Sequence, residues 1–335
     1  MKKKLLIISV ILIIGIVSIV VFLPKALPQK TTLVPLKISL NWLHQAQYAG
    51  MYVAKEKGFY QELGLDPTFI EYDSATSPID MLKNGQSDFI SIHASDLFRF
   101  IDDGIAIKAI AAINETSPYA LISLEESNIK TPTSFTGKNL GIKGGTDEGL
   151  YLYNILLKEF NINPNTVKFV STSFDTTIVE DLMSKKVDLI DMYRTDQLYL
   201  FDQQGIKYNL IKPELFGYQS YGDIIVTTNK YIEDNPKIVA DFVQATITGW
   251  QYALDHQDEA VDLTLKYVTN KYYQDKNYES FILSQSEPLI RSSKMAKIGD
   301  MNYLIWRRQK DFFFKNGIIK NNIDVSQIYT TEFIK

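Results

Sequence analysis

Cysteine is absent from the 335 residues, and histidine occurs only as His44, His93 and His256. The lack of cysteine excludes disulfide bonds, thiolate metal sites, catalytic thiols and a lipid attached to an N-terminal cysteine. No two histidines lie close enough in the sequence to form a metal-binding helix of the HExxH type. We therefore predict neither a metal site nor a bound cofactor.

A strong charge of one sign is also lacking. The chain has 35 Lys and Arg against 39 Asp and Glu, a formal net charge of −4, so a broad basic face for nucleic acid is not expected. Apolar residues make up 45%, which is typical of a globular protein, and the length suits two domains or one large one. Aromatic residues make up 12% and leave many rings to line a ligand cleft. The composition favours a binding domain or an enzyme that uses carboxylates and hydroxyls.

A single long apolar run lies at the N-terminus. Three lysines at positions 2–4 precede the uncharged stretch Leu5 to Leu23, whose helical length of about 28 Å is close to the thickness of a hydrocarbon core. Lysines on the N-terminal side keep that end in the cytoplasm, so the body faces outside. Residues 1–24 are predicted to be an uncleaved membrane anchor or a cleaved signal peptide, and both export the body. Residues 25–35 are predicted to be a proline-containing tether.

The first part of the body alternates predicted strands and helices. Leu36, Ile38, Leu40 and Trp42 alternate with polar residues, which indicates a strand. The other predicted strands are 67–72, 89–92 and 107–113, and the helices between them are 48–58, 78–85 and 95–103. This order favours a mainly parallel sheet covered by helices, over residues 36–118.

The same pattern returns in a second predicted lobe, residues 119–228. Its strands are 140–142, 167–170 and 189–192, its helices are 147–160 and 177–185, and 119–124 and 223–228 are predicted crossover strands. Residues 80–88 and 181–188 repeat one order: a short amphipathic helix, a polar turn, an aspartate and a buried strand. Residues 229–335 are predicted to be mostly helical and to return to the first lobe. A ligand would bind between the lobes, beyond the carboxyl ends of the strands.

Three stretches carry a resemblance to a known family. Asn41 and Trp42 are followed by AGMYVAKEKGFYQELGLDP at 49–67, LKNGQSDFI at 82–90 and TGKNLGIKGGT at 136–146. Over about residues 36–230 the chain resembles the thiamine-pyrimidine synthases and related solute-binding proteins, the NMT1/THI5-like family. The resemblance implies an α/β, two-lobed type II periplasmic-binding-protein fold. Members include binding subunits of ABC importers for formylaminopyrimidine, and enzymes that build the thiamine pyrimidine from their own histidine and pyridoxal phosphate. Other relatives bind sulfonates or riboflavin.

The chain departs from the family at two places. The synthases carry a lysine four residues before the donor histidine, but Phe89 stands four residues before His93, and their cysteine-rich iron motif is absent. An enzymatic role is therefore not predicted. The importer subunits carry a glutamate four residues after a tyrosine that matches Tyr193, but here that position is Gln197, with Asp196 beside it. A glutamine offers only a neutral amide to an aminopyrimidine, so the ligand stays open.

The first-lobe candidates lie at predicted strand ends. Asn41 and Trp42 would fix and stack a planar heterocycle, or would be a chain-turning amide and a core indole. Tyr48 is a second wall candidate, or the buried start of a helix. His93, Ser95 and Asp96 follow the third strand, where free N–H groups of a helix start suit a polar ligand, unless they only cap the helix.

The second-lobe candidates follow the same logic. Gly144, Gly145 and Thr146 precede a helix and form either an anion loop or a plain turn. Tyr193, Asp196 and Gln197 follow the matching strand, as cleft residues or as a helix cap with a surface tyrosine. Further candidates for the hinge or the cleft rim are Tyr218, Tyr221 and Asp223.

Together these features predict an extracytoplasmic solute-binding protein of an ABC importer, in which two lobes close over a small planar heterocycle. A thiamine pyrimidine precursor fits the resemblance best. The expected partners are the permease and ATPase subunits and, through the N-terminal helix, the membrane; no nucleic acid is expected. The alternatives are a thiamine-pyrimidine synthase and a ligand-sensing ectodomain.

Overall fold

The computed structural model describes residues 32–335, except residues 74, 145–146, 174–176, 294 and 335. The predicted signal or anchor helix at 1–24 and most of the tether at 25–35 lie outside the described residues. Within the described ranges, no helix is both long and apolar enough to cross a membrane. The chain from Pro35 onward forms one compact unit.

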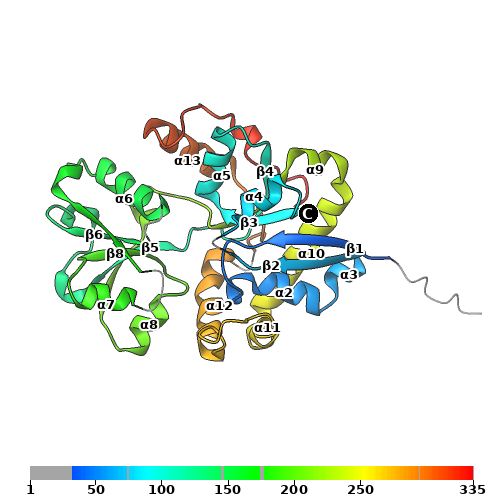
Figure 1. The fold of residues 1–335 in the computed structure, drawn as a ribbon, viewed down its shortest axis with the longest axis horizontal. Coiled ribbons are helices and arrows are strands. Elements are labelled where there is room, and N and C mark those ends of the chain that lie inside the picture. The colour runs from blue at the N-terminus through cyan, green and yellow to red at the C-terminus, as the bar shows by residue number, and fades with distance from the viewer. Residues whose placement is uncertain (1–31, 74, 145–146, 174–176, 294, 335) are drawn as a thin grey trace, which may run out of the picture. The chain divides into compact units, whose positions relative to one another are not determined.

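A first five-stranded sheet has the order β2-β1-β3-β10-β4 (Figure 1). β1 and β3 are parallel, whereas β10 runs antiparallel to both β3 and β4. The strands are β1 (Val34–Ser39), β2 (Leu65–Ile70), β3 (Phe89–His93), β4 (Ile107–Ala112) and β10 (Asp223–Thr228). The helices between the early strands are α2 (Ala49–Glu56), α3 (Phe59–Glu62), α4 (Pro78–Lys83) and α5 (Ala94–Asp102).

A second five-stranded sheet has the order β7-β6-β8-β5-β9. β6 is parallel to β7 and β8, and β5 is antiparallel to β8 and β9. The strands are β5 (Tyr119–Leu124), β6 (Asn139–Lys143), β7 (Lys168–Thr172), β8 (Leu189–Tyr193) and β9 (Tyr208–Ile211), and the helices are α6 (Asp147–Glu159), α7 (Ile178–Met183) and α8 (Leu198–Gln203). The first sheet with its helices is called lobe 1 below, and the second sheet with its helices lobe 2.

Strand β10 lies in lobe 1, although the sequence predicts residues 223–228 as a crossover strand of the second lobe. Its register places Asp223 opposite His93 and Ile225 opposite Ser91. Ile224, Ile225 and Val226 are all fully buried, because helices cover both faces of this sheet. The chain thus returns to the first sheet at Asp223, and this return brings the Asp223 carboxylate to the end of β3.

The C-terminal third is helical, as the sequence predicts, and packs on lobe 1. Its helices are α9 (Asn229–Asp234), α10 (Pro236–Asp255), α11 (Gln257–Thr264), α12 (Lys276–Ile290) and α13 (Tyr303–Lys315). α10 crosses α2 so closely that a Cβ at Gly249 would lie 2.1 Å from the Gly50 carbonyl oxygen, and a Cβ at Gly50 would lie 2.2 Å from Cγ of Trp250. Only glycine at both positions allows the two helices to meet, and this packing fixes the start of α2 near the cleft.

The repeat seen in the sequence marks equivalent positions in the two sheets. The Asp88 carboxylate accepts a 2.8 Å hydrogen bond from the Lys37 backbone N–H, and the Asp88 N–H donates to the Lys37 carbonyl. In lobe 2 the Asp188 carboxylate accepts from the Asn139 N–H at 2.8 Å, and the Asp188 N–H donates to the Asn139 carbonyl. Each aspartate therefore ties its strand to the preceding parallel strand, and β3 and β8 end at corresponding points.

The chain passes between the sheets twice, through residues 113–118 after β4 and residues 212–222 before β10. These two connecting segments are hydrogen-bonded to each other, from the Gly222 N–H to the Asn114 carbonyl and from the Ser117 N–H to the Ser220 carbonyl. A Cβ at Gly222 would lie 2.7 Å from Cδ of Pro118. The two connections therefore run as one joined strip beside the cleft.

Candidate ligand-binding site

A cavity of about 550 Å³ opens between the two lobes, where β1, β3, β6 and β8 end. Its volume is in the range of small-molecule sites. The polar and aromatic residues that line it come from lobe 1 (Asn41, Trp42, Gln47, Tyr72, Ser77, His93, Asp96, Arg99 and Phe100) and from lobe 2 (Tyr119, Lys143, Tyr193 and Asp196).

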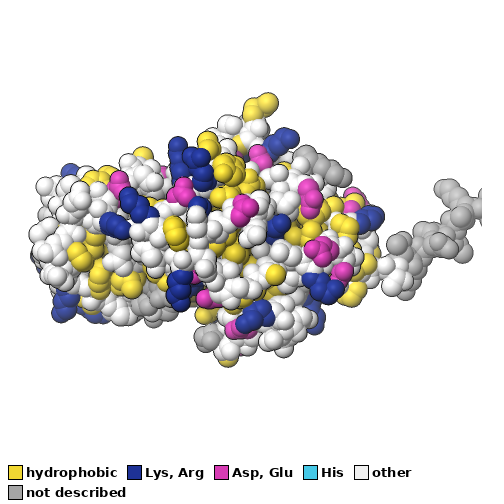
Figure 2. Space-filling model, turned by 90° about the horizontal axis from the view of Figure 1, so that it is seen from above, with side chains coloured by type: hydrophobic (Ala, Val, Ile, Leu, Met, Phe, Trp, Pro, Cys, Tyr) yellow, Lys and Arg dark blue, Asp and Glu magenta, His cyan; other side chains and the backbone are white. Residues whose placement is uncertain are grey.

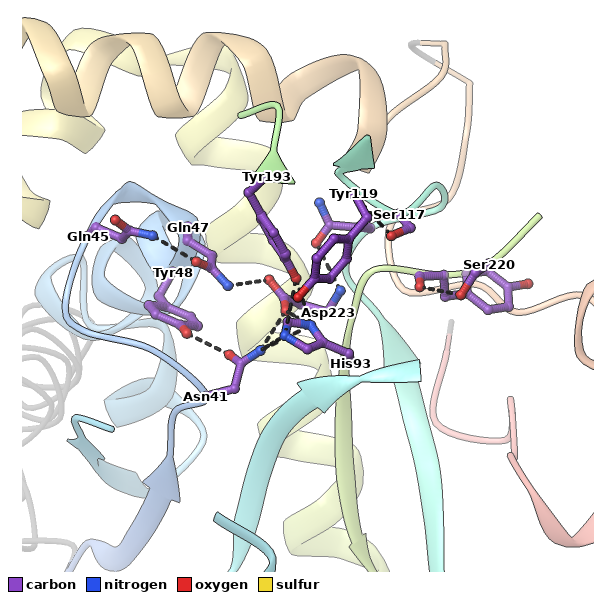
Figure 3. A network of polar contacts seen from close by, with 12 residues as sticks. Asn41, Gln45, Gln47, Tyr48, His93, Ser117, Tyr119, Tyr193, Ser220 and Asp223 are labelled. Atoms are coloured by element: carbon purple, nitrogen blue, oxygen red, sulfur yellow. Dashed lines mark hydrogen bonds and ion pairs between the residues drawn. The ribbon is translucent and has the colours of Figure 1, made fainter. Parts of the chain in front are cut away.

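The buried Asp223 carboxylate organises the lobe 1 side of the cavity (Figure 3). Nδ2 of Asn41 donates to Oδ1 of Asp223 at 2.9 Å, and Nε2 of Gln47 donates to Oδ2 at 2.7 Å. Nδ1 of His93 lies 3.4 Å from Oδ1, because the register places His93 and Asp223 opposite each other. Two amides and an imidazole are thus held in fixed positions by one carboxylate.

Tyr48 supports this network from behind. Its hydroxyl donates to Oδ1 of Asn41 at 2.6 Å, while its ring is 1% exposed. Burial, together with the nearby Asp223 carboxylate, raises the pKa of Tyr48 well above its ordinary value. The residue that reaches the cavity is its neighbour Gln47, because the 3-10 turn Ala46–Tyr48 directs the two side chains differently.

A hydrogen bond joins the two lobes across the floor of the cavity. The Tyr193 hydroxyl lies 2.6 Å from Nδ1 of His93. The Tyr119 ring packs edge-on against both, with its centroid 5.7 Å from that of His93 and 4.6 Å from that of Tyr193. Figure 3 shows the three rings gathered around the Asp223 side chain. The ends of β3, β5 and β8 therefore meet in one aromatic cluster.

Trp42 and Tyr72 form an aromatic wall. Their rings stack with centroids 6.1 Å apart and planes at 19°, and both side chains are only partly buried. The Lys143 ammonium, from the end of β6, lies 5.4 Å from the Trp42 centroid and 5.8 Å from the Tyr193 centroid. The cavity therefore offers planar surfaces and a cation in close proximity.

Behind Lys143 lie two buried carboxylates. The Lys143 backbone N–H donates to Oδ1 of Asp191 at 2.7 Å, and burial raises the pKa of Asp191 to about 6. Asp196 accepts hydrogen bonds from the Tyr278 hydroxyl and from Nε2 of Gln197, and burial raises its pKa also. Burial lowers the pKa of the Lys143 ammonium, and both carboxylates oppose that shift.

Gln197 is engaged inside lobe 2. Its Nε2 donates a hydrogen bond to Asp196, and its Oε1 accepts a 2.8 Å hydrogen bond from the Tyr193 N–H. It is buried and does not line the cavity. Its role in this structure is to hold Tyr193 and Asp196 in place.

The remaining predicted residues lie in different surroundings. Asp96 lines the cavity and accepts from Nη2 of Arg99 at 2.6 Å, whereas Ser95 is buried beside it. Gly144 lines the cavity, and Gly145 and Thr146 lie outside the described residues. Tyr221 points toward α13, where its hydroxyl accepts from the Asn302 N–H and its ring packs 5.0 Å from Trp306.

Several lining residues were not singled out from the sequence: Gln47, Tyr72, Arg99, Tyr119 and Lys143. Lys143 and Tyr119 did carry a signal, because each stands at the cleft end of a predicted strand. Tyr72 carried the same signal, as the last residue of the predicted strand 67–72, whereas Gln47 and Arg99 carry none that local sequence supplies. In the part of the chain that the structure describes, no group of three or more His, Asp or Glu side chains is arranged to hold a metal ion.

Comparisons with known proteins agree with this architecture. A family model described as NMT1/THI5 like matches residues 45–260. The riboflavin-binding protein RibY of Chloroflexus aurantiacus is 24% identical over 323 residues, which cover 93% of this chain and 88% of that protein. The formylaminopyrimidine-binding protein of Halalkalibacterium halodurans is 19% identical over 231 residues, 68% of this chain and 69% of that protein.

The fold matches solved structures. The periplasmic aliphatic sulphonate binding protein SsuA from Escherichia coli superposes with a TM-score of 0.68 at 15% identity, over 88% of this chain and 96% of that one. The predicted two-lobed α/β fold is therefore confirmed as that of a periplasmic binding protein.

Proposed function

The chain belongs to the NMT1/THI5-like family, and from that premise we propose that it is the extracytoplasmic solute-binding protein of an ABC importer. It holds a small planar heterocycle between its lobes and presents the closed form to a permease. The observation that carries the proposal is the cavity itself, which is lined by aromatic and polar side chains from both lobes and bridged by the Tyr193–His93 hydrogen bond.

Binding would proceed by stacking and by closure. The Trp42 and Tyr72 rings supply a planar apolar surface, while Asn41, Gln47 and His93 supply hydrogen-bonding groups fixed around Asp223. Because the lobes contact each other through the cavity floor, a ligand that touches both lobes stabilises the closed form. Closure also changes the surface that a membrane partner meets.

The relatives of this chain point to two classes of ligand. The resemblance and the Halalkalibacterium relative favour a thiamine pyrimidine precursor. The RibY relative, which matches 93% of the chain, favours a flavin. Both are planar heterocycles, and a cavity of about 550 Å³ is compatible with a ligand of either size.

We propose further that the protein does not convert its ligand. The lysine–histidine pair of the synthases is absent from the sequence, and His93 is engaged by Tyr193, Asn41 and Asp223. Incubation of the purified protein with pyridoxal phosphate and iron should leave the masses of peptides containing His44, His93 and His256 unchanged. A loss of mass at any of these histidines would overturn this part of the proposal.

The proposal also includes export of the body of the protein and its interaction with the other subunits of an importer. The apolar run at 5–23 carries the body across the membrane, and the permease and ATPase subunits of an importer receive the closed form. Charged side chains of both signs are mixed over the described part of the face in Figure 2, which gives no indication of a nucleic-acid surface.

The test is ligand binding by the full chain in detergent. Melting temperature and titration calorimetry would be recorded with formylaminopyrimidine, riboflavin and an alkanesulfonate, and mass spectrometry would identify small molecules released from the purified protein. A ligand at 100 times its Kd should add about 2.7 kcal/mol to the free energy of unfolding. If neither heterocycle shifts the melt and no small molecule is released, the proposal fails.

A further inference from the structure

Lys143 has an unusual place in the cavity. It ends β6 of lobe 2, and its ammonium reaches over the Trp42 ring of lobe 1 and the Tyr193 ring of its own lobe. Among the residues that the structure describes, the ammonium has no hydrogen-bond acceptor and no carboxylate within ion-pair distance; its contacts are the two aromatic faces. A partly buried cation without an ion-pair partner carries a cost, and a ligand acceptor would reduce that cost.

The carboxylates in and beside the cavity already accept hydrogen bonds from the chain's own donors, and Asp96 accepts at Oδ1 from Nη2 of Arg99. Both oxygens of Asp223 accept from amides, those of Asn41 and Gln47. The two oxygens of Asp196 accept from Tyr278 and Gln197. Recognition of an amino-substituted ring needs an acceptor, and each of these oxygens already accepts one hydrogen bond from a donor of the protein, which leaves it less open to a ring amino group.

Gln197 does not supply the missing acceptor. Its Oε1 receives the Tyr193 N–H and its Nε2 serves Asp196, so both ends of the amide are used. Lys143 therefore stands out in the cavity as a donor that no acceptor among the described residues occupies. An ammonium carries three N–H donors and no acceptor, which suits carbonyl or anionic oxygens.

We propose that Lys143 determines specificity, and that the ligand is a planar heterocycle whose edge carries oxo groups rather than amino groups. The ring stacks against Trp42, and its carbonyl edge faces the Lys143 ammonium. This inference rests on the proposed function and narrows it. Two sources share this chemistry, the flavin ring system and the simple pyrimidinediones, whereas the ring of a thiamine pyrimidine carries an amino group.

The test uses titrations of the full chain in detergent with riboflavin, thymine and formylaminopyrimidine. The variants are Lys143→Met, which keeps most of the length of the side chain but removes the charge, and Lys143→Arg, which keeps the charge. The matched control is Lys168→Met, an exposed lysine on β7 of the same lobe. Melting curves establish that each variant is folded, and Lys143→Gln replaces Lys143→Met if the latter does not fold.

The wild-type protein should bind an oxo probe at least about tenfold more tightly than formylaminopyrimidine. Lys143→Met should lose about tenfold or more in affinity for the oxo probe, whereas its affinity for the amino probe should change little. Lys143→Arg should keep part of the affinity for the oxo probe. Lys168→Met should bind all probes as the wild type does. Binding of riboflavin alone would identify a flavin site, and binding of thymine a pyrimidinedione site.

The outcomes separate the two proposals. If formylaminopyrimidine binds most tightly, or if Lys143→Met leaves the affinity for the oxo probe unchanged, the inference on Lys143 is wrong while the binding function stands. If none of the three probes binds to the wild-type protein, the inference on Lys143 is overturned, and the binding function falls with it only if mass spectrometry also finds no small molecule released from the purified protein.

Discussion

Tyr193 and His93 are one hundred residues apart, end corresponding strands of the two sheets, and meet side chain to side chain at 2.6 Å. The correspondence follows from the repeat in which Asp88 and Asp188 make the same backbone contacts in each lobe. The internal repeat of this protein thus produces the contact that joins its two halves.

Removal of the Tyr193 hydroxyl should loosen this contact. Tyr193→Phe keeps the ring against Tyr119 and removes the hydrogen bond to His93. A net hydrogen bond contributes about 1 kcal/mol, so the ligand affinity should fall about fivefold if the bond supports the closed form. Titration calorimetry measures the effect, and Tyr208→Phe, which removes a surface hydroxyl bonded to Asp202 in the same lobe, is the control. Equal affinities for both variants would contradict the prediction.

Trp42 and Trp306 should respond differently to truncation. Trp42 is partly exposed and lines the cavity, whereas Trp306 is 0% exposed in the core against Phe98. Trp42→Ala should weaken ligand binding by about 1 kcal/mol or more through lost stacking, with a small change in melting temperature. Trp306→Ala should cost about 3–5 kcal/mol of stability. A Trp42→Ala protein that melts as low as Trp306→Ala yet binds normally once folded would rule out a cleft role for Trp42.

Glu279 should make the protein less stable as the pH rises. It is buried on α12, where burial raises the pKa of its carboxyl from 4.5 to about 8. The folded state therefore binds more protons than the unfolded state between these values, and the stability contributed below pH 4.5 is lost as the pH rises to about 8. Glu279→Gln keeps an acceptor for the Ala46 N–H, and should flatten this dependence and raise stability at pH 8. Urea unfolding from pH 5 to 8 tests this, with exposed Glu126→Gln as the control.

The α2–α10 crossing should not tolerate a methyl group. In Gly50→Ala the new Cβ would lie 2.2 Å from the Trp250 ring, so one helix must shift. Overpacking of this kind costs about 1–3 kcal/mol. Thermal melts compare this variant with Gln61→Ala, at an exposed position on α3. A Gly50→Ala protein that melts with the wild type would show that the two helices are not in close contact.

Much of the architecture was accessible from sequence, because strand alternation and strand-end polar residues are local signals. Asn41, Trp42, His93, Tyr193 and Asp196 all line the cavity, since parallel strands end at the same edge of a sheet. The sequence could not show which of the two sheets contains the strand 223–228, because a strand that is buried on both faces fits either lobe. Local pattern also cannot decide between Gln47 and Tyr48, since a single 3-10 turn directs one side chain into the cavity and the other into the core. The direction of the Tyr221 side chain could not be predicted for a similar reason, because it depends on contacts with α13, which lies far along the chain.

The two connections between the sheets restrict how the halves can move. Two independent connecting segments would allow the lobes to slide and rotate freely. Here the two segments are hydrogen-bonded to each other, from Gly222 to Asn114 and from Ser117 to Ser220. Hydrogen bonds between the two segments resist sliding of one past the other, so we expect the halves to move mainly by bending about the joined strip. Gly222, with no room for a Cβ beside Pro118, lies on that axis. A side chain introduced there would act as a wedge that changes the preferred angle without touching the cavity.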